Sequence, residues 1–100
     1  MIELTFNKEN SGKYLLLLNQ NGVELFSKEY DASKKYTSGW KDQATLFTAY
    51  VKFIQNNINK DIKKNPNFKF SNYKEFKKYA GSNMINEFFD HESEYMPKKS

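Results

Sequence analysis

The chain of 100 residues contains no cysteine, no arginine, one histidine, two prolines and four glycines. Without cysteine it has no disulfide framework, no thiolate metal site and no cysteine nucleophile. A single histidine also excludes multi-histidine metal sites. The longest purely apolar run, Leu15 to Leu18, falls far short of the ~20 residues that span a bilayer, so we expect no membrane contact.

A chain of this length fits one domain, which buries roughly 60–70% of its unfolded surface. We predict a single domain over residues 1–100, with a sheet half at 1–30, a helical half at 41–96 and a short basic tail at 97–100. The N-terminus has no basic segment followed by an apolar one, as a signal peptide would. We therefore expect a cytoplasmic protein.

All sixteen basic residues are lysine, and they outnumber the acidic residues by four. Asparagine is also abundant, and such a composition is typical of AT-rich genomes. Lysine lacks the planar fork with which arginine grips phosphate or guanine. Any contact with nucleic acid would therefore be mainly electrostatic, salt-sensitive and poor at reading sequence.

Three antiparallel strands are predicted in the first thirty residues. Residues 2–6 alternate between apolar and polar, which is typical of a half-buried strand, whereas 14–18 is continuously apolar and is expected to be central and buried on both faces. Asn21-Gly22 predicts a two-residue hairpin turn before a third strand at 23–30, with Leu18 opposite Leu25.

Ser38 or Asp42 is expected to cap the next helix, and helical spacing from Asp42 to Lys64 predicts one long helix across the sheet. Residues 67–70 alternate and are an alternative short fourth strand. Two shorter helices are expected next: one begins at a capping box of Asn72 and Glu75 and ends at a left-handed Gly81, and the other spans 83–96. The predicted class is α+β: a three-stranded meander covered by one long and two shorter helices.

The order of strands, helix and strand resembles the start of an RNase H-like fold. Residues 12–54 are similar to the second and third strands and first helix of that family, and residues 68–72 to its fourth strand. The family holds two metal ions with carboxylates, but the aligned positions here are Asn7, Thr45 and Asn72. The resemblance therefore implies an inactive relative and no nuclease.

No catalytic motif is present: there is no nucleophile elbow, no glycine-rich phosphate loop and no zinc-protease helix. His91 lies between Asp90 and Glu92, but adjacent residues of a helix point in different directions and do not converge on one ion. A surface histidine that pairs with Glu87 or Glu94 is the expected alternative. We predict a protein that is not an enzyme and has no cofactor and no metal.

Positive charge is concentrated in residues 52–78, which carry eight lysines against two acids. Five aromatic residues are interleaved with them, as on surfaces that bind single-stranded nucleic acid; the alternative is that they are core. An acidic protein partner fits the same charge. The nucleic-acid alternative assigns binding to Lys60, Lys63, Lys64, Lys69, Lys74, Lys77 and Lys78.

Seventeen aromatic side chains are many for a domain of this size, so some are expected at the surface as partner anchors. Trp40 and Tyr36, with Lys34 and Lys35 beside them, are the predicted protein-binding residues; packing at the sheet edge is the alternative for Trp40. The expected function is to bind and occlude a host or defence-system protein, as phage and mobile-element inhibitors such as anti-CRISPR proteins do. The protein is expected to be a monomer or a homodimer.

Overall fold

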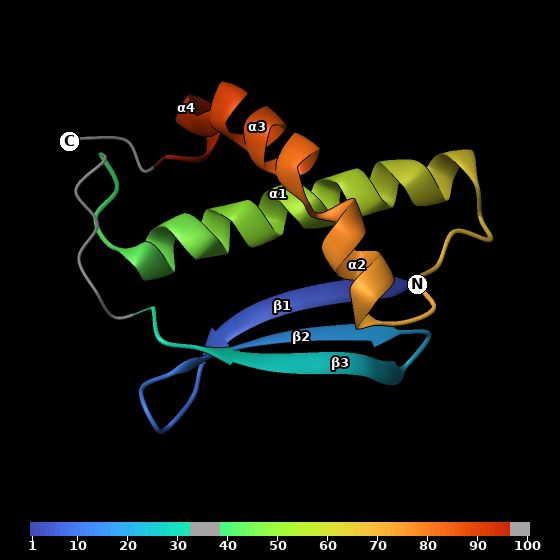
Figure 1. The fold of residues 1–100 in the computed structure, drawn as a ribbon, viewed down its shortest axis with the longest axis horizontal. Helices are drawn as coiled ribbons and strands as arrows, with labels where there is room; N and C mark the ends of the chain where they lie inside the picture. The colour runs from blue at the N-terminus through green and yellow to red at the C-terminus, as the bar shows by residue number, and fades with distance from the viewer. Residues whose placement is uncertain (33–38, 97–100) are drawn as a thin grey trace.

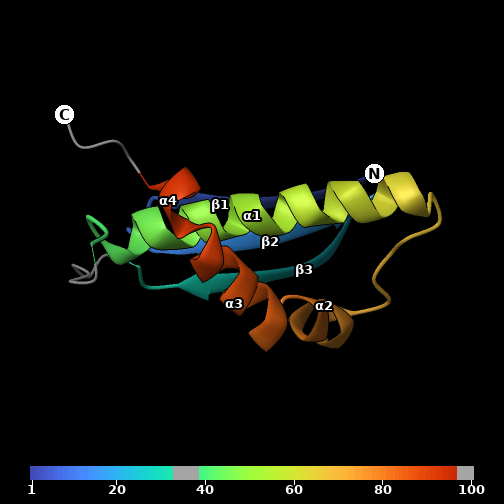
Figure 2. The ribbon, with the colours of Figure 1, turned by 90° about the horizontal axis from the view of Figure 1, so that it is seen from above.

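The computed structural model describes residues 1–32 and 39–96, and all helices of these ranges lie on one face of a three-stranded sheet (Figures 1 and 2). This arrangement confirms the predicted α+β class. The elements are β1 (Ile2–Lys8), β2 (Tyr14–Gln20), β3 (Val23–Tyr30), α1 (Gln43–Lys64), α2 (Tyr73–Tyr79), α3 (Ser82–Asp90) and α4 (Glu92–Tyr95).

The sheet is an antiparallel meander in the order β1-β2-β3. Asn21 and Gly22 have φ of 54° and 81°, as the predicted hairpin turn requires. The predicted register is wrong by one residue: a bulge after Leu18 places Phe26, not Leu25, opposite it. The bulge turns Phe26 toward the helices, where it is buried against Tyr73 and Phe76.

The two faces of β2 differ in burial. Leu16 and Leu18 face the helices and belong to the core, but Leu15 and Leu17 point to the opposite face and are only half-buried. The prediction that this strand is buried on both faces is therefore wrong, because the described helices cover one face only (Figure 1).

Helix α1 begins where predicted, at an N-cap Asp42 that accepts a hydrogen bond from the Thr45 backbone N–H at 2.7 Å. Its buried stripe packs over β1. On the same side, Gln55 donates to the Ile2 carbonyl at 2.9 Å and accepts from the Leu4 N–H at 2.6 Å. This amide therefore satisfies the free edge of β1, as a neighbouring strand would.

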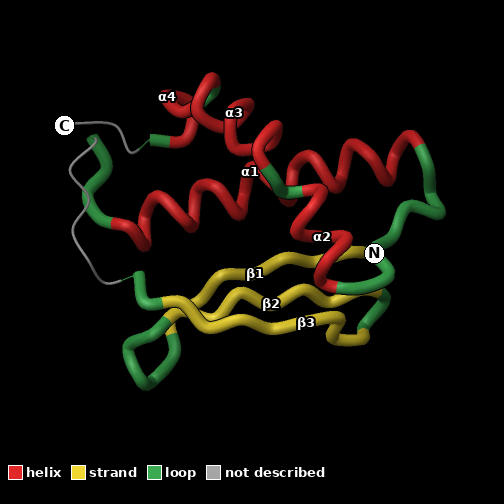
Figure 3. Tube along the Cα trace, viewed as in Figure 1, coloured by secondary structure: helices red, strands yellow, loops and turns green. Residues whose placement is uncertain are grey.

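The segment 67–70 is a loop, not a fourth strand (Figure 3). The Gln20 side chain takes the place of a pairing strand: its amide nitrogen donates to the Phe70 carbonyl at 2.9 Å, and its oxygen accepts from the Phe70 N–H at 2.8 Å. An amide offers the same donor and acceptor as a peptide group, so one side chain satisfies Phe70 without a ladder. The fourth strand implied by the RNase H-like resemblance is thus absent from the described residues.

Two predictions about the last helices need correction, and one is confirmed. Asn72 caps α2 by accepting from the Glu75 N–H, as predicted. Gly81 has φ of −85°, so it does not adopt the predicted left-handed conformation and is instead the N-cap of α3. The predicted helix 83–96 breaks at His91 into α3 and α4, and the break lets Tyr95 pack against Phe53.

Candidate functional site

Trp40, predicted to anchor a partner, lies in the core with 3% of its surface exposed. Its indole N–H donates to a Glu92 carboxylate oxygen at 2.5 Å, and its ring stacks on Phe88. Trp40 therefore fastens the segment before α1 to α3 and α4, and it is not available to a partner. The other predicted partner-binding residues, Lys34, Lys35 and Tyr36, lie outside the described residues.

The lysines of the predicted nucleic-acid surface are all exposed, but they do not form one patch. One group lies in the last turns of α1, and Figures 1 and 2 place this end of the helix away from α2. A second group projects from α2, and one lysine lies in the intervening loop. The groups are Lys60, Lys63 and Lys64; Lys74, Lys77 and Lys78; and Lys69.

The aromatic residues of 52–78 serve mainly the core. Phe53, Phe70 and Phe76 are buried, and Phe68 and Tyr73 are half-buried among other rings. The predicted stacking platform for bases is therefore not formed by these side chains. The lysines remain as a solvated cationic surface without flat exposed rings between them.

His91 pairs with Glu94, as the surface alternative predicts: its Nδ1 lies 2.6 Å from Oε2, and both side chains are exposed. Within residues 1–32 and 39–96, no three histidine, aspartate or glutamate side chains converge as a metal site would require. The RNase H-like positions do not converge either. Asn7 lies on the open face of the sheet, Thr45 interacts with the cap of α1, and Asn72 caps α2.

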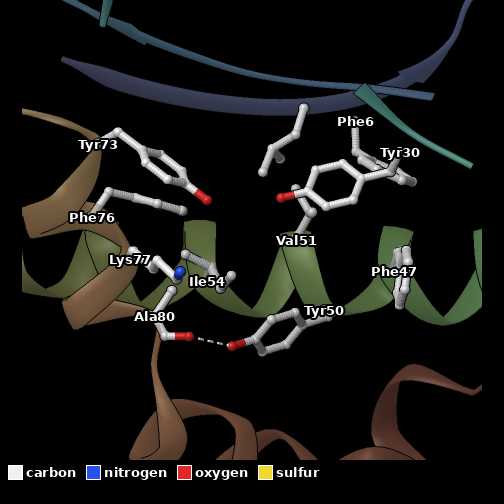
Figure 4. A pocket seen from close by; sticks show the side chains of 11 residues that line it. Phe6, Tyr30, Phe47, Tyr50, Val51, Ile54, Tyr73, Phe76, Lys77 and Ala80 are labelled. Carbon is white, nitrogen blue, oxygen red and sulfur yellow. Dashed lines mark hydrogen bonds between the residues drawn. The ribbon is translucent and has the colours of Figure 1, made fainter. Parts of the chain in front are cut away.

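A feature that the sequence did not predict is a pocket of about 270 Å³ between the sheet, α1 and α2 (Figure 4). Its walls are almost entirely apolar or aromatic, and each of the three layers supplies part of them. The lining residues are Phe6, Leu16 and Tyr30 from the sheet; Phe47, Tyr50, Val51 and Ile54 from α1; and Tyr73, Phe76, Lys77 and Ala80 from α2 and its end.

Four polar groups line this pocket, and one of them is already used. The Tyr50 hydroxyl donates to the Ala80 carbonyl at 2.8 Å, and burial raises the pKa of Tyr50 to about 12. The hydroxyls of Tyr30 and Tyr73 and the Lys77 ammonium turn toward the middle of the pocket (Figure 4). Burial, followed by the neighbouring Tyr73 hydroxyl, raises the pKa of Tyr30. Tyr30 and Tyr50 are therefore neutral phenols at physiological pH.

A second, smaller hollow of about 170 Å³ lies next to the pocket, between α1 and α3. It shares Phe47 and Tyr50 with the pocket and has no polar lining atoms. On α3 its rim is formed by Ile85 and Phe89, which are 40% and 45% exposed. The two hollows adjoin at Phe47 and Tyr50, and together we call them the aromatic groove.

The charge around the aromatic groove is positive. None of its lining residues is acidic, and Lys77 is the only charged one. Lys74 lies three residues before Lys77, on the same side of α2. Lys28 adds a third ammonium, 4.6 Å from the centre of the Tyr73 ring.

The opposite face of the sheet carries negative charge. Glu3 and Glu29 alternate with the inward-facing residues of β1 and β3 and project from that face. The chain therefore presents a cationic aromatic groove on one side and acidic residues on the other.

The sequence of α3 indicates that Phe89 and Ile85 are exposed. Phe88 and Phe89 are adjacent, so a helix cannot bury both on one face. Phe88 is 1% exposed in the core, and Phe89 must then point outward beside Ile85, one turn away. No such signal exists for the pocket, because its walls come from three layers whose packing angles are not encoded in local spacing.

Comparison of the chain with protein-family models, with curated proteins and with solved structures finds no match. No helix in the described part of the chain has both the length and the hydropathy of a membrane span. Any function must therefore be argued from the aromatic groove and its charges.

Proposed function

We propose that this protein is a non-enzymatic binding protein whose aromatic groove receives an aromatic side chain from an acidic segment of a protein partner and thereby occludes that segment. The observation that carries the proposal is the exposure of Phe89 and Ile85 beside an apolar hollow. Contiguous exposed apolar surface in a small domain marks an interaction site. Fixed aromatic side chains around a pocket are also typical of binding hot spots.

The lysines at the rim of the aromatic groove favour a partner segment with negative charge. Lys28, Lys74 and Lys77 surround a groove without an acidic lining residue, so acidic residues next to the anchor in the partner are favoured. We take a host or defence-system protein as the partner class, by analogy with the small accessory proteins of phages and mobile elements. Occlusion by an inhibitor of the anti-CRISPR kind is one form of this function.

Nucleic acid is the alternative partner, and the position of the rings argues against it. Buried Phe53, Phe70 and Phe76 cannot stack on bases, and the lysines of α1 and α2 lie apart. Phosphate attraction alone would give weak binding that falls steeply with salt.

A synthetic acidic peptide with one central phenylalanine tests the proposal directly by fluorescence polarisation. We expect saturable binding that is lost when the phenylalanine of the peptide is changed to alanine. Phe89→Ser should weaken binding about ten-fold, the size of a hot-spot truncation. Because Phe89 is 45% exposed, the variant should still fold.

Charge variants provide the matched control. Lys74→Glu, beside the groove, should weaken peptide binding, whereas Lys63→Glu, on the last turn of α1, should not. Equal effects of the two variants, or no peptide binding, would sink the proposal. A gel shift across a salt series provides the other outcome: nucleic-acid binding weakened by Lys63→Glu as much as by Lys74→Glu supports the alternative.

A further inference from the structure

The pocket part of the aromatic groove combines deep apolar walls with three polar ends that face one another. The Tyr30 hydroxyl comes from β3, and the Tyr73 hydroxyl and Lys77 ammonium come from α2 (Figure 4). Lys77 has no ion-pair partner among the described residues. An apolar cavity with a few convergent polar groups is the usual form of a ligand site.

The size of the pocket limits the ligand. A cavity of ~150 Å³ holds benzene, so about 270 Å³ accommodates roughly ten non-hydrogen atoms. Aromatic rings line several sides: Phe6, Phe47 and Tyr50 surround one end, and Tyr73 and Phe76 the other. A ligand of this size with one ring and a short chain would contact these walls throughout.

The polar ends define the head group of the ligand. An ammonium only donates hydrogen bonds, and neutral phenols donate readily to an anion. Because no acidic residue lines the pocket, nothing there compensates the ammonium or favours a cationic ligand. A group that accepts from several donors and carries negative charge fits this arrangement.

We propose that the pocket binds an apolar carboxylate, with its ring among the aromatic walls and its carboxylate held by Lys77 and the hydroxyls of Tyr30 and Tyr73. This chemistry has two sources: a free aromatic acid, and the C-terminal aromatic residue of a protein. The second source rests on the proposed function, since that residue would be the anchor of the partner. The first needs no protein partner.

Isothermal titration of the whole protein with two pairs of probes tests the chemistry and distinguishes the sources. The free-acid pair is 3-phenylpropionate and its neutral amide; the C-terminal pair is N-acetylphenylalanine and its amide. We expect each acid to bind with at least about ten-fold higher affinity than its amide, because a hydrogen bond to a charged group is lost in the amide. Tighter binding of N-acetylphenylalanine identifies a protein C-terminus, and tighter binding of phenylpropionate identifies a free acid.

Variants show whether the binding occurs in this pocket. Lys77→Gln should reduce the affinity for the acids about ten-fold and leave that for the amides unchanged. Lys78→Gln is the matched control, because Lys78 is exposed on the same helix and does not line the pocket. Tyr73→Phe, which keeps the ring and removes the hydroxyl, should reduce the affinity for the acids a few-fold.

Three results would overturn the inference: no saturable binding of either acid at millimolar concentration, equal affinity for acid and amide, or equal loss in Lys77→Gln and Lys78→Gln. Its failure is separable from failure of the proposed function. Peptide binding that is lost in Phe89→Ser but unaffected by Lys77→Gln would leave the protein-binding groove standing and remove only the carboxylate site.

Discussion

The Gln20 amide that pairs with Phe70 gives the sharpest stability prediction. Gln20→Ala removes two hydrogen bonds of 2.9 and 2.8 Å and leaves the peptide groups of a residue that is 4% exposed without partners. An unsatisfied buried group costs about 1–3 kcal/mol, so we expect a loss of about 2 kcal/mol in the free energy of unfolding. With a urea m-value of about 1–2 kcal/mol/M, the unfolding midpoint falls by roughly 1–2 M.

Gln20→Glu separates the two hydrogen bonds. A carboxylate still accepts from the Phe70 N–H, but it places an acceptor instead of a donor against the Phe70 carbonyl, so we expect a loss of stability at neutral pH. When the carboxyl is protonated at acid pH, it regains a donor, and the difference in unfolding free energy from the wild type should shrink. Asn19→Ala, on the opposite face of β2, is the matched control.

Amide hydrogen exchange tests the hydrogen bond between Gln20 and Phe70 at a single residue. The Phe70 N–H should be protected in the wild type and in Asn19→Ala, and it should exchange much faster in Gln20→Ala. A loss of stability below about 0.5 kcal/mol, the range of ordinary surface changes, together with unchanged exchange at Phe70, would refute the reasoning.

Three further predictions concern the aromatic core. Phe88→Ala should lower the free energy of unfolding, measured in urea, by about 3–5 kcal/mol, because Phe88 is 1% exposed and contacts five other aromatic rings. A loss below ~1 kcal/mol would contradict this packing. Because the pKa of Tyr50 is raised to about 12, the neutral Tyr50 hydroxyl stabilises the fold fully below pH 10, and this contribution is lost as pH rises toward about 12. Tyr50→Phe should therefore flatten the alkaline fall in the free energy of unfolding, measured in urea. An identical dependence of that free energy on pH in both proteins would contradict it. Buried Trp40, the only tryptophan, should emit at short wavelength and be quenched weakly by acrylamide until the protein unfolds; emission typical of a solvated indole would place it at the surface.

Local chemistry explains why much of the fold is readable from the sequence. Asn21-Gly22 adopts the positive φ angles of its turn, and Asp42 and Asn72 accept hydrogen bonds at the helix starts. Each of these features depends on residues close in the chain. The apolar residues of α1 likewise recur with the period of a helix, so this helix can be predicted from its own segment alone.

What the sequence did not predict depends on distant partners. The bulge after Leu18 is favoured because Phe26 gains contacts with α2, which lies almost fifty residues later. Residues 67–70 alternate like a strand, but a side-chain amide from Gln20 replaces the ladder. Gly81 is the N-cap of α3 and not a left-handed cap at the end of α2, because α3 follows it directly.

The candidate site was predicted least well. Trp40 looked like a surface anchor because it precedes a helix, yet its ring and its N–H both find partners in the C-terminal helices. The aromatic groove needs β3, α1, α2 and α3 at once. The adjacency of Phe88 and Phe89 is the one local signal that could have shown that one large ring must remain outside.

The central claim is that the aromatic groove binds an aromatic side chain of an acidic partner. Amide chemical shifts of the ¹⁵N-labelled protein, followed during titration with the acidic phenylalanine peptide, test it most directly. The account predicts saturable shifts at Phe47, Tyr50, Ile85 and Phe89 and on the Lys74 side of α2, with the open face of the sheet unaffected. Shifts confined to the last turns of α1, or to the open face with Leu15 and Leu17, would contradict it.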